Sequence, residues 1–171
     1  MKNTFTLIAI ALTPALFSQT SIPLIISTPY QQNFDALIST GNANWDDTVT
    51  LGGWYATENN IYADDGNDVF GGRLHSYGGA NSSERALGAK SFSSLSGVEF
   101  GVRMKNNGNN SINFFQIGFR GEQWRQNTNS VTMKFYYQVN APNLTTGTWI
   151  PVPQLYLYPF HVGSASALDG N

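Results

Sequence analysis

The sequence predicts an all-β fold, namely an antiparallel β-sandwich of jelly-roll type, and three observations support this. The chain has 171 residues, which suits one domain. Only 12% of its residues are charged, and it lacks the long Ala/Glu/Lys/Leu stretches from which helices are built. Its apolar residues instead alternate with polar ones over short runs, the pattern of strands that bury one face.

The clearest alternation lies within residues 98–139. Apolar side chains occupy every second position over 98–104 and again over 131–139, and an aromatic-rich run lies between them. The two links, 106–110 and 125–130, are rich in Asn, Gly, Ser and Thr, which favour turns. We therefore expect three strands that pair as an antiparallel meander on one side of the sandwich.

The other elements follow from shorter patterns. Pro23 and Pro29 restrict the first apolar run to a sheet edge, and Trp54 alternates with small residues, as in a strand that packs one ring inward. The elements expected in chain order are an edge strand within 21–30, a strand at 52–56, an Asp/Asn/Gly-rich loop at 59–72, a strand at 73–77, a strand through 85–87, and apolar runs at 148–152 and 154–160.

The N-terminus has the pattern of a signal peptide over residues 1–18. Lys2 precedes an apolar run from Phe5 to Phe17, which is too short to cross a bilayer as a helix. We therefore expect an exported protein whose single domain covers residues 19–171. The chain has no cysteine, which excludes disulfides, thiolate nucleophiles, Cys-based metal sites and a lipoprotein anchor.

The charge pattern argues against two classes of partner. The formal net charge is −2, and the nine basic residues are scattered singly along the chain. No basic stripe is present to neutralise nucleic-acid phosphates, and no polybasic segment marks a membrane surface. We expect neither nucleic acid nor a membrane span in the mature chain.

The GEQWR motif at residues 121–125 is the first candidate ligand site. Glu122 could act as a general acid, Arg125 as a carboxylate clamp and Trp124 as a platform for a sugar ring. The structural alternative is that Glu122 pairs with an arginine, Arg85 or Arg120, while Trp124 packs in the core.

The ADDGND motif at residues 63–68 is the candidate metal site. Asp64, Asp65 and Asp68 surround Gly66, and calcium prefers six to eight oxygen ligands, which carboxylates on a turn can supply. The spacing matches no EF-hand. The alternative is an acidic loop exposed to solvent.

The sequence offers little for catalysis. It has no tight cluster of carboxylates of the kind found in jelly-roll glucanases, and its two histidines, His75 and His161, stand beside no nucleophile elbow. Aromatic side chains instead suggest glycan stacking, against the alternative that they fill the space between two sheets. These aromatic residues are Trp54, Tyr55, Tyr62, Tyr77, Trp124, Tyr136, Tyr156 and Tyr158.

Several motifs together resemble a known family. GGWYA, DDG, HSYG, SSERALG, FGVRMKNN, GFRGEQWR, FYYQVNAPNLTTGTW and ALDGN follow one another between residues 30 and 171. This series resembles a concanavalin-like β-sandwich module of secreted bacterial proteins. Such modules commonly lie near the N-terminus of large exported proteins and precede immunoglobulin-like or lamin-tail repeats, nuclease or phosphatase-like domains, or a sorting signal.

The resemblance implies three further expectations. Similar modules continue past ALDGN through two more strands, so we expect this chain to be incomplete at its C-terminus. In related jelly rolls an acidic residue near the first strand binds a structural calcium, which makes Asp35 a second metal candidate. The expected partners are downstream domains of the same polypeptide and a glycan or surface polymer.

The function expected from the sequence is a secreted, non-catalytic module that is accessory to another domain or binds a glycan or surface polymer weakly. Tyr77 joins Trp124, Glu122 and Arg125 as the residues that would contact such a ligand. One alternative is a polysaccharide-active hydrolase or lyase, and another is a structural or adhesive spacer stabilised by calcium.

Overall fold

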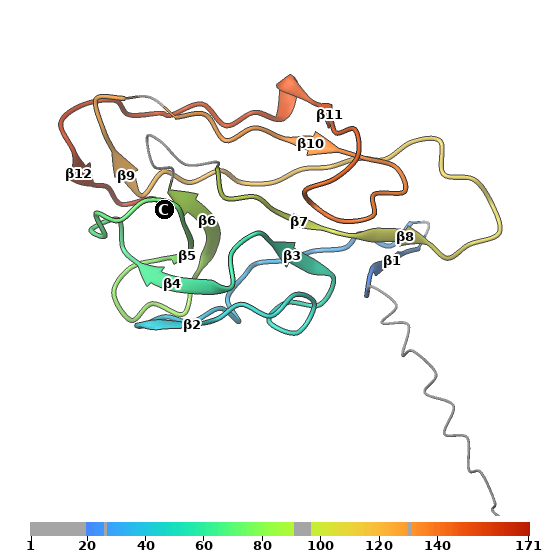
Figure 1. The fold of residues 1–171 in the computed structure, drawn as a ribbon, viewed down its shortest axis with the longest axis horizontal. Coiled ribbons are helices and arrows are strands. Elements are labelled where there is room, and N and C mark those ends of the chain that lie inside the picture. The colour runs from blue at the N-terminus through green and yellow to red at the C-terminus, as the bar shows by residue number, and fades with distance from the viewer. Residues whose placement is uncertain (1–19, 26, 91–96, 130) are drawn as a thin grey trace, which may run out of the picture.

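The computed structural model describes residues 20–25, 27–90, 97–129 and 131–171 (Figure 1). Over these residues the chain forms twelve short strands, one 3₁₀ turn and no α-helix, so the all-β prediction is confirmed. The elements are β1 (Ile22–Leu24), β2 (Asn42–Asn44), β3 (Trp54–Ala56), β4 (Asn60–Asp64), β5 (Arg73–Tyr77), β6 (Ala86–Lys90), β7 (Phe100–Val102), β8 (Met104–Asn106), β9 (Arg125–Gln126), β10 (Tyr136–Tyr137), β11 (Ile150–Pro151), η1 (Pro153–Leu155) and β12 (Ser166–Ala167).

The largest sheet has four strands in the order β2-β4-β5-β6. β4 and β5 are parallel, whereas β2 with β4 and β5 with β6 are antiparallel. The strands expected at 73–77 and through 85–87 are confirmed as β5 and β6. The loop expected at 59–72 is partly wrong, because residues 60–64 form β4, whose Ile61 is almost completely buried despite the polar composition around it.

The hydrophobic core lies on one face of this sheet. Ile61 on β4, Leu74 on β5 and Leu87 on β6 point to that face and pack together with Leu37, Trp45 and Leu51 from the preceding chain. Trp54 on β3 packs against the same cluster, as the alternation around it predicts. These core residues come from three strands and from the loops on either side of β2, so the cluster joins residues 37–87 into one unit.

The meander predicted within residues 98–139 is wrong. β7 pairs with β3 and β8 pairs in parallel with β1, while β10 pairs with β11. The aromatic-rich run at 111–124 contains no strand. Alternation determines which side chains share a face, but it leaves the pairing partner open, and partners distant in sequence formed these ladders.

The remaining strands make four two-stranded sheets, and in Figure 1 the chain after β8, coloured yellow to red, forms a layer above the earlier part. β9 pairs with β12 at the end of the molecule where the C-terminus lies. This is an all-β arrangement of several open sheets.

The two layers meet where residues 124–125 contact the turn after β4. Arg125 donates from Nη1 to the carbonyl oxygen of Gly66 at 2.8 Å. Gly66 has a φ of +89°, and a Cβ there would collide with the main-chain carbonyl of Trp124. Glycine at position 66 therefore permits both the turn and the close approach of the second layer.

We expect Gly66→Ala to lower the free energy of unfolding by at least about 3 kcal/mol, because it combines backbone strain with a main-chain collision. Gly41→Ala is the matched control: Gly41 also has a positive φ, of +65°, but a Cβ there would meet nothing within 4 Å. The control should lose only about 1 kcal/mol. Urea denaturation measures both losses. Equal losses would contradict the close approach of Trp124 to the turn at Gly66.

Candidate functional site

The face of the four-stranded sheet opposite the core carries aromatic and charged side chains. Because side chains alternate along a strand, the neighbours of Ile61 and Leu74 point away from the core. The register sets Tyr62 opposite His75 and Asp64 opposite Tyr77, and on the other side it sets Arg73 opposite Lys90. We call this surface the polar face; its residues are Tyr62, Asp64, Arg73, His75, Tyr77 and Lys90.

A stack of rings covers the polar face. The His75 and Tyr77 rings stack with centroids 5.0 Å apart, and Trp124 from the second layer stacks on Tyr77 at 6.3 Å and 7°. A Cβ on Gly88 would lie 2.7 Å from the Tyr77 ring, so glycine there leaves room for the phenol. Burial raises the pKa of Tyr77, and the charges of Asp64 and Asp68 raise it further, so this phenol stays neutral.

The turn after β4 is held by its own aspartates. Oδ1 of Asp64 accepts the backbone N–H groups of Gly66 at 2.8 Å and Asp68 at 3.0 Å. Oδ1 of Asp68 accepts the N–H of Phe70 at 2.8 Å, and its Oδ2 lies 3.3 Å from Nη1 of Arg73. These are Asx-type turns, so each of the two carboxylates uses one oxygen to shape the backbone.

His75 is the least satisfied polar side chain of the polar face. It is fully buried, and among the residues that the structure describes neither Nδ1 nor Nε2 has a hydrogen-bond partner. Nδ1 lies 3.5 Å from Oδ2 of Asp64 and faces it. A buried polar atom without a partner costs about 1–3 kcal/mol, so the unpaired imidazole lowers the stability of the folded chain.

One ligand atom from each of Asp64, Asp68 and His75 lies within 4.8 Å of the other two. Asp64 and Asp68 were predicted as metal ligands from the ADDGND motif, and the structure brings them together. Asp65 turns its carboxylate instead to the main chain and side chain of Asn67, at 3.2 and 2.9 Å. Asp35 lies apart, where it accepts the backbone N–H of Arg85 at 3.2 Å.

His75 was missed as a partner of these aspartates. Its alternation with Leu74 was clear, but residues 59–72 were interpreted as a loop. Predicting a strand at 60–64 would not have been enough to find this pair. Asp64 and His75 lie on one face because β4 and β5 pair in parallel, and the sequence did not reveal that pairing.

The GEQWR residues have structural contacts. Trp124 is buried and donates its indole N–H to Oε2 of Glu122 at 3.0 Å, while Nε of Arg120 lies 3.9 Å from Oε1 of the same carboxylate. The roles of Trp124 and Tyr77 as sugar platforms do not fit these buried rings, whose faces are occupied by each other and by His75. Arg125 binds the Gly66 carbonyl.

The pairing of Glu122 with Arg85 is not formed, whereas its pairing with Arg120 is. Arg85 is buried, and its Nε donates to Oγ of Ser76 at 2.9 Å while its Nη2 donates to the Ser76 carbonyl. Arg85 therefore binds the main chain and side chain of Ser76 on β5 and makes no ion pair with Glu122.

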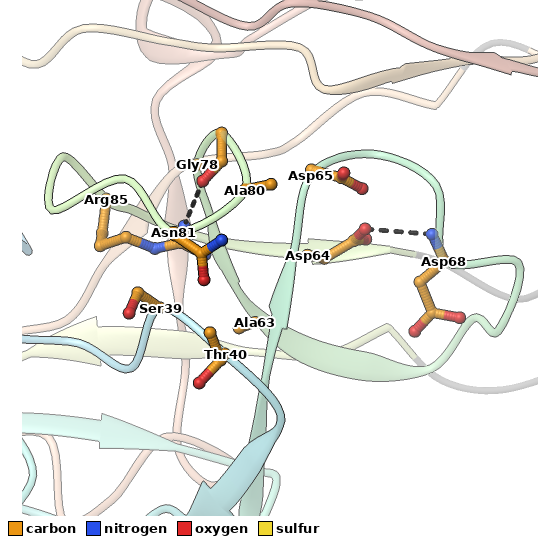
Figure 2. A pocket seen from close by; sticks show the side chains of 11 residues that line it. Ser39, Thr40, Ala63, Asp64, Asp65, Asp68, Gly78, Ala80, Asn81 and Arg85 are labelled. Atoms are coloured by element: carbon orange, nitrogen blue, oxygen red, sulfur yellow. Dashed lines mark hydrogen bonds between the residues drawn. The ribbon is translucent and has the colours of Figure 1, made fainter.

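An open hollow of about 320 Å³ adjoins the aspartates (Figure 2). Figure 2 shows the carboxylate of Asp64 directed toward Asp68, with Asn81 and Arg85 across the hollow. Its lining consists of Ser39, Thr40, Ala63, Asp64, Asp65, Asp68, Gly78, Gly79, Ala80, Asn81 and Arg85. Solvent and small ions can therefore reach the turn after β4 from this side.

Comparisons with protein-family models, with curated proteins and with solved structures found no match. Over the residues that the structure describes, no helix has the length and apolar character needed to span a membrane.

We expect His75 to make the stability of the metal-free protein depend on pH near neutrality. Burial lowers the pKa of His75 below its usual value of 6.5, against the opposing effect of Asp64 and Asp68. The unfolded chain therefore binds a proton below about pH 6.5 that the folded chain resists, so stability is complete above this pH and falls below it.

In EDTA, the free energy of unfolding should fall as the pH is lowered from about 6.5 to about 5.5. Urea denaturation across this range measures the slope, and His75→Gln should flatten it. His161→Gln, at the only other histidine, should leave the slope unchanged. An unchanged slope in His75→Gln would show that His75 is not the titrating group.

Proposed function

We propose that this chain is a non-catalytic, jelly-roll β-sandwich module of a larger exported protein, and that it binds a neutral glycan or similar polymer weakly. The binding surface in this proposal is the tyrosine row, which consists of Tyr136, Tyr156 and Tyr158. The two-layer, all-β arrangement supports the sandwich. The signal-peptide pattern at residues 1–18 and the family resemblance support export and the larger protein.

The tyrosine row is the observation that carries the proposal. The ring centroids of Tyr136 and Tyr156 lie 6.4 Å apart, and those of Tyr156 and Tyr158 are separated by the same distance. Tyr136 is 41% and Tyr158 61% exposed. Aromatic rings exposed side by side are unusual unless they contact something, because they leave apolar area in water.

The local strand pattern explains why the three rings share one side. β10 pairs with β11, and Met133 bridges to Leu157 farther along the same ribbon. Leu157 lies against Gly121, where a Cβ would meet its side chain at 2.7 Å. Because side chains alternate, the residues on both sides of Leu157, Tyr156 and Tyr158, point the other way.

The same alternation holds on the partner strand. The Phe135 ring stacks on Phe119 at 6.0 Å, so Phe135 faces the interior of this layer. Tyr136 follows Phe135 and therefore faces out, toward the side of Tyr156 and Tyr158. The ribbon thus has one face that packs on residues 119–121 and one face that presents tyrosines.

The chemistry of the row favours a neutral, hydroxyl-rich ligand. Tyrosine combines a flat apolar ring with a hydroxyl group that can donate or accept a hydrogen bond, which suits the alternating apolar and polar faces of sugars. No Asp, Glu, Lys or Arg occurs between residues 135 and 168. A charged polymer would find no counter-charge in this segment of the chain.

Asp64 and Asp68 do not favour the hydrolase or lyase alternative. Asp64 and Asp68 each commit one oxygen to the turn, and the remaining oxygen of Asp68 faces Arg73. A general acid needs a carboxyl group that is free to deliver its proton to a bound substrate.

We expect Tyr158→Ala and Tyr136→Ala each to weaken binding to a neutral polysaccharide about fivefold, because a lost stacking ring costs about 1 kcal/mol. Affinity electrophoresis against a panel of soluble polysaccharides, followed by calorimetry on the best, measures this. Tyr137→Ala is the matched control: Tyr137 is 45% exposed but alternates with Tyr136 and so faces the other side.

Three outcomes would contradict the proposal. Equal losses in the control and in the row variants would mean that the ribbon binds without a specific face. Release of reducing ends from the panel would indicate a polysaccharide-active enzyme. The absence of binding to every polymer of the panel would leave the structural or adhesive spacer as the better interpretation.

A further inference from the structure

The polar face holds a group of side chains that glycan binding does not use. His75 is fully buried on β5, and within the described part of the chain both of its ring nitrogens lack a hydrogen-bond partner. It lies beneath the Tyr77 and Trp124 rings, so no sugar can reach it. Its Nδ1 faces a carboxylate oxygen of Asp64 at 3.5 Å. A buried imidazole with neither nitrogen paired indicates that a partner belongs beside it.

The neighbouring aspartates each offer an oxygen on the same side. Oδ1 of Asp64 is used by two backbone N–H groups, and within the described chain no hydrogen bond reaches its Oδ2. Oδ2 of Asp68 takes no part in the turn bond to Phe70, and it accepts a hydrogen bond from Nη1 of Arg73 at 3.3 Å. Two carboxylate oxygens and one imidazole nitrogen thus converge within 4.8 Å.

We propose that Asp64, Asp68 and His75 bind a divalent transition-metal cation, for which Zn²⁺ is the best match. Imidazole nitrogen and carboxylate oxygen together form a donor set that zinc commonly takes. Calcium, which the aspartates alone suggested, binds oxygen and needs six to eight such ligands. Asp65 and Asp35, which would have supplied more oxygens, are engaged elsewhere.

The present spacing requires a small closure around an ion. Zinc lies about 2.0–2.2 Å from nitrogen and oxygen ligands, so tetrahedral ligands lie about 3.4 Å apart. Nδ1 of His75 and Oδ2 of Asp64 are already 3.5 Å apart, so the approach, of at most about 1.4 Å, is required of Asp68. Asp68 can make this movement because it lies on the turn and is only partly buried, whereas Asp64 and His75 are fixed in their strands.

Three basic side chains lie near the site, and each of them has a partner other than the two metal-binding carboxylates. Arg73 is the competitor for Asp68, and its guanidinium lies over the rings of Tyr62 at 4.3 Å and Phe70 at 4.4 Å. These rings can hold Arg73 without Asp68, because aromatic faces attract cations. Lys90 and Arg125 bind main-chain carbonyls, those of Asp68 and Gly66.

An ion has a way in from the solvent. The open hollow beside the turn is lined by both Asp64 and Asp68 (Figure 2). A water molecule from this hollow can complete a fourth coordination position. The cation would join β4, β5 and the turn between them.

The test uses the tag-free chain, stripped with EDTA and titrated with Zn²⁺ against a chromophoric chelator. We expect one equivalent of Zn²⁺ to bind and to raise the melting temperature, and about 1 mM Ca²⁺ to do neither. Co²⁺ as a probe should give the visible absorption of a site with a nitrogen ligand.

Three variants locate the site. Asp68→Asn should weaken Zn²⁺ binding at least tenfold and leave the fold intact, because Asp68 is partly exposed. Asp65→Asn, at a neighbouring aspartate outside the cluster, is the matched control and should bind within about twofold of the parent. His75→Gln should remove the nitrogen signature from the Co²⁺ spectrum.

The proposal is wrong if the parent chain binds no Zn²⁺ at about 100 μM, or if Asp68→Asn binds as tightly as the parent. Equal weakening by Asp65→Asn and Asp68→Asn would reduce the site to a general acidic patch and would also overturn it. His161→Gln checks that the remaining histidine does not supply the binding.

Discussion

The structure depends on covering both faces of β5. Leu74, His75, Ser76 and Tyr77 are all buried, although their side chains point alternately to opposite faces. Leu74 packs in the core formed by the first half of the chain. His75 and Tyr77 need a second cover, which comes from Trp124, more than 40 residues later.

This cover in turn explains several local features. Trp124 reaches Tyr77 only because Gly66 admits its main chain and Gly88 leaves space beneath the Tyr77 ring. A Cβ on Gly170 would lie 2.5 Å from the Trp124 indole, so the C-terminal segment packs closely against this ring. Leu168 donates its N–H to the Trp124 carbonyl at 2.8 Å. Trp124 is therefore the point at which the second layer and the C-terminus join the four-stranded sheet.

Local patterns in the sequence were sufficient for the fold class and for some strands. β5 was predicted with its observed bounds because alternation and flanking glycines are both local signals. β4 was missed because Asn, Asp and Gly dominate its surroundings, although Ile61 on it is a core residue. The prediction of a meander was wrong for a different reason. β7 pairs with β3 and β8 pairs with β1, and pairings between strands so distant in sequence depend on the whole core.

In the candidate site, too, some features follow from local sequence and others depend on pairing between distant strands. Asp64 and Asp68 are four residues apart on one turn, so their proximity follows from local sequence. The burial of Trp124 and the pairing of Glu122 with Arg120 matched the structural alternative that the sequence left open. The approach of His75 to Asp64 required the parallel register of β4 and β5, and no local pattern reveals that register.

The two proposed sites have separate roles, and their positions show why. The tyrosine row lies on the outer face of the β10–β11 ribbon, while the aspartates and His75 lie under the ring stack on the four-stranded sheet. A cation at the second site would not touch a polymer on the first. It would instead hold the turn that carries Gly66, to which Arg125 and thus the second layer are attached.

The chain has no cysteine, so a disulfide cannot hold the two layers together. A metal ion that links β4, β5 and their turn would stabilise the folded chain at that junction, because it binds the folded state and not the unfolded one.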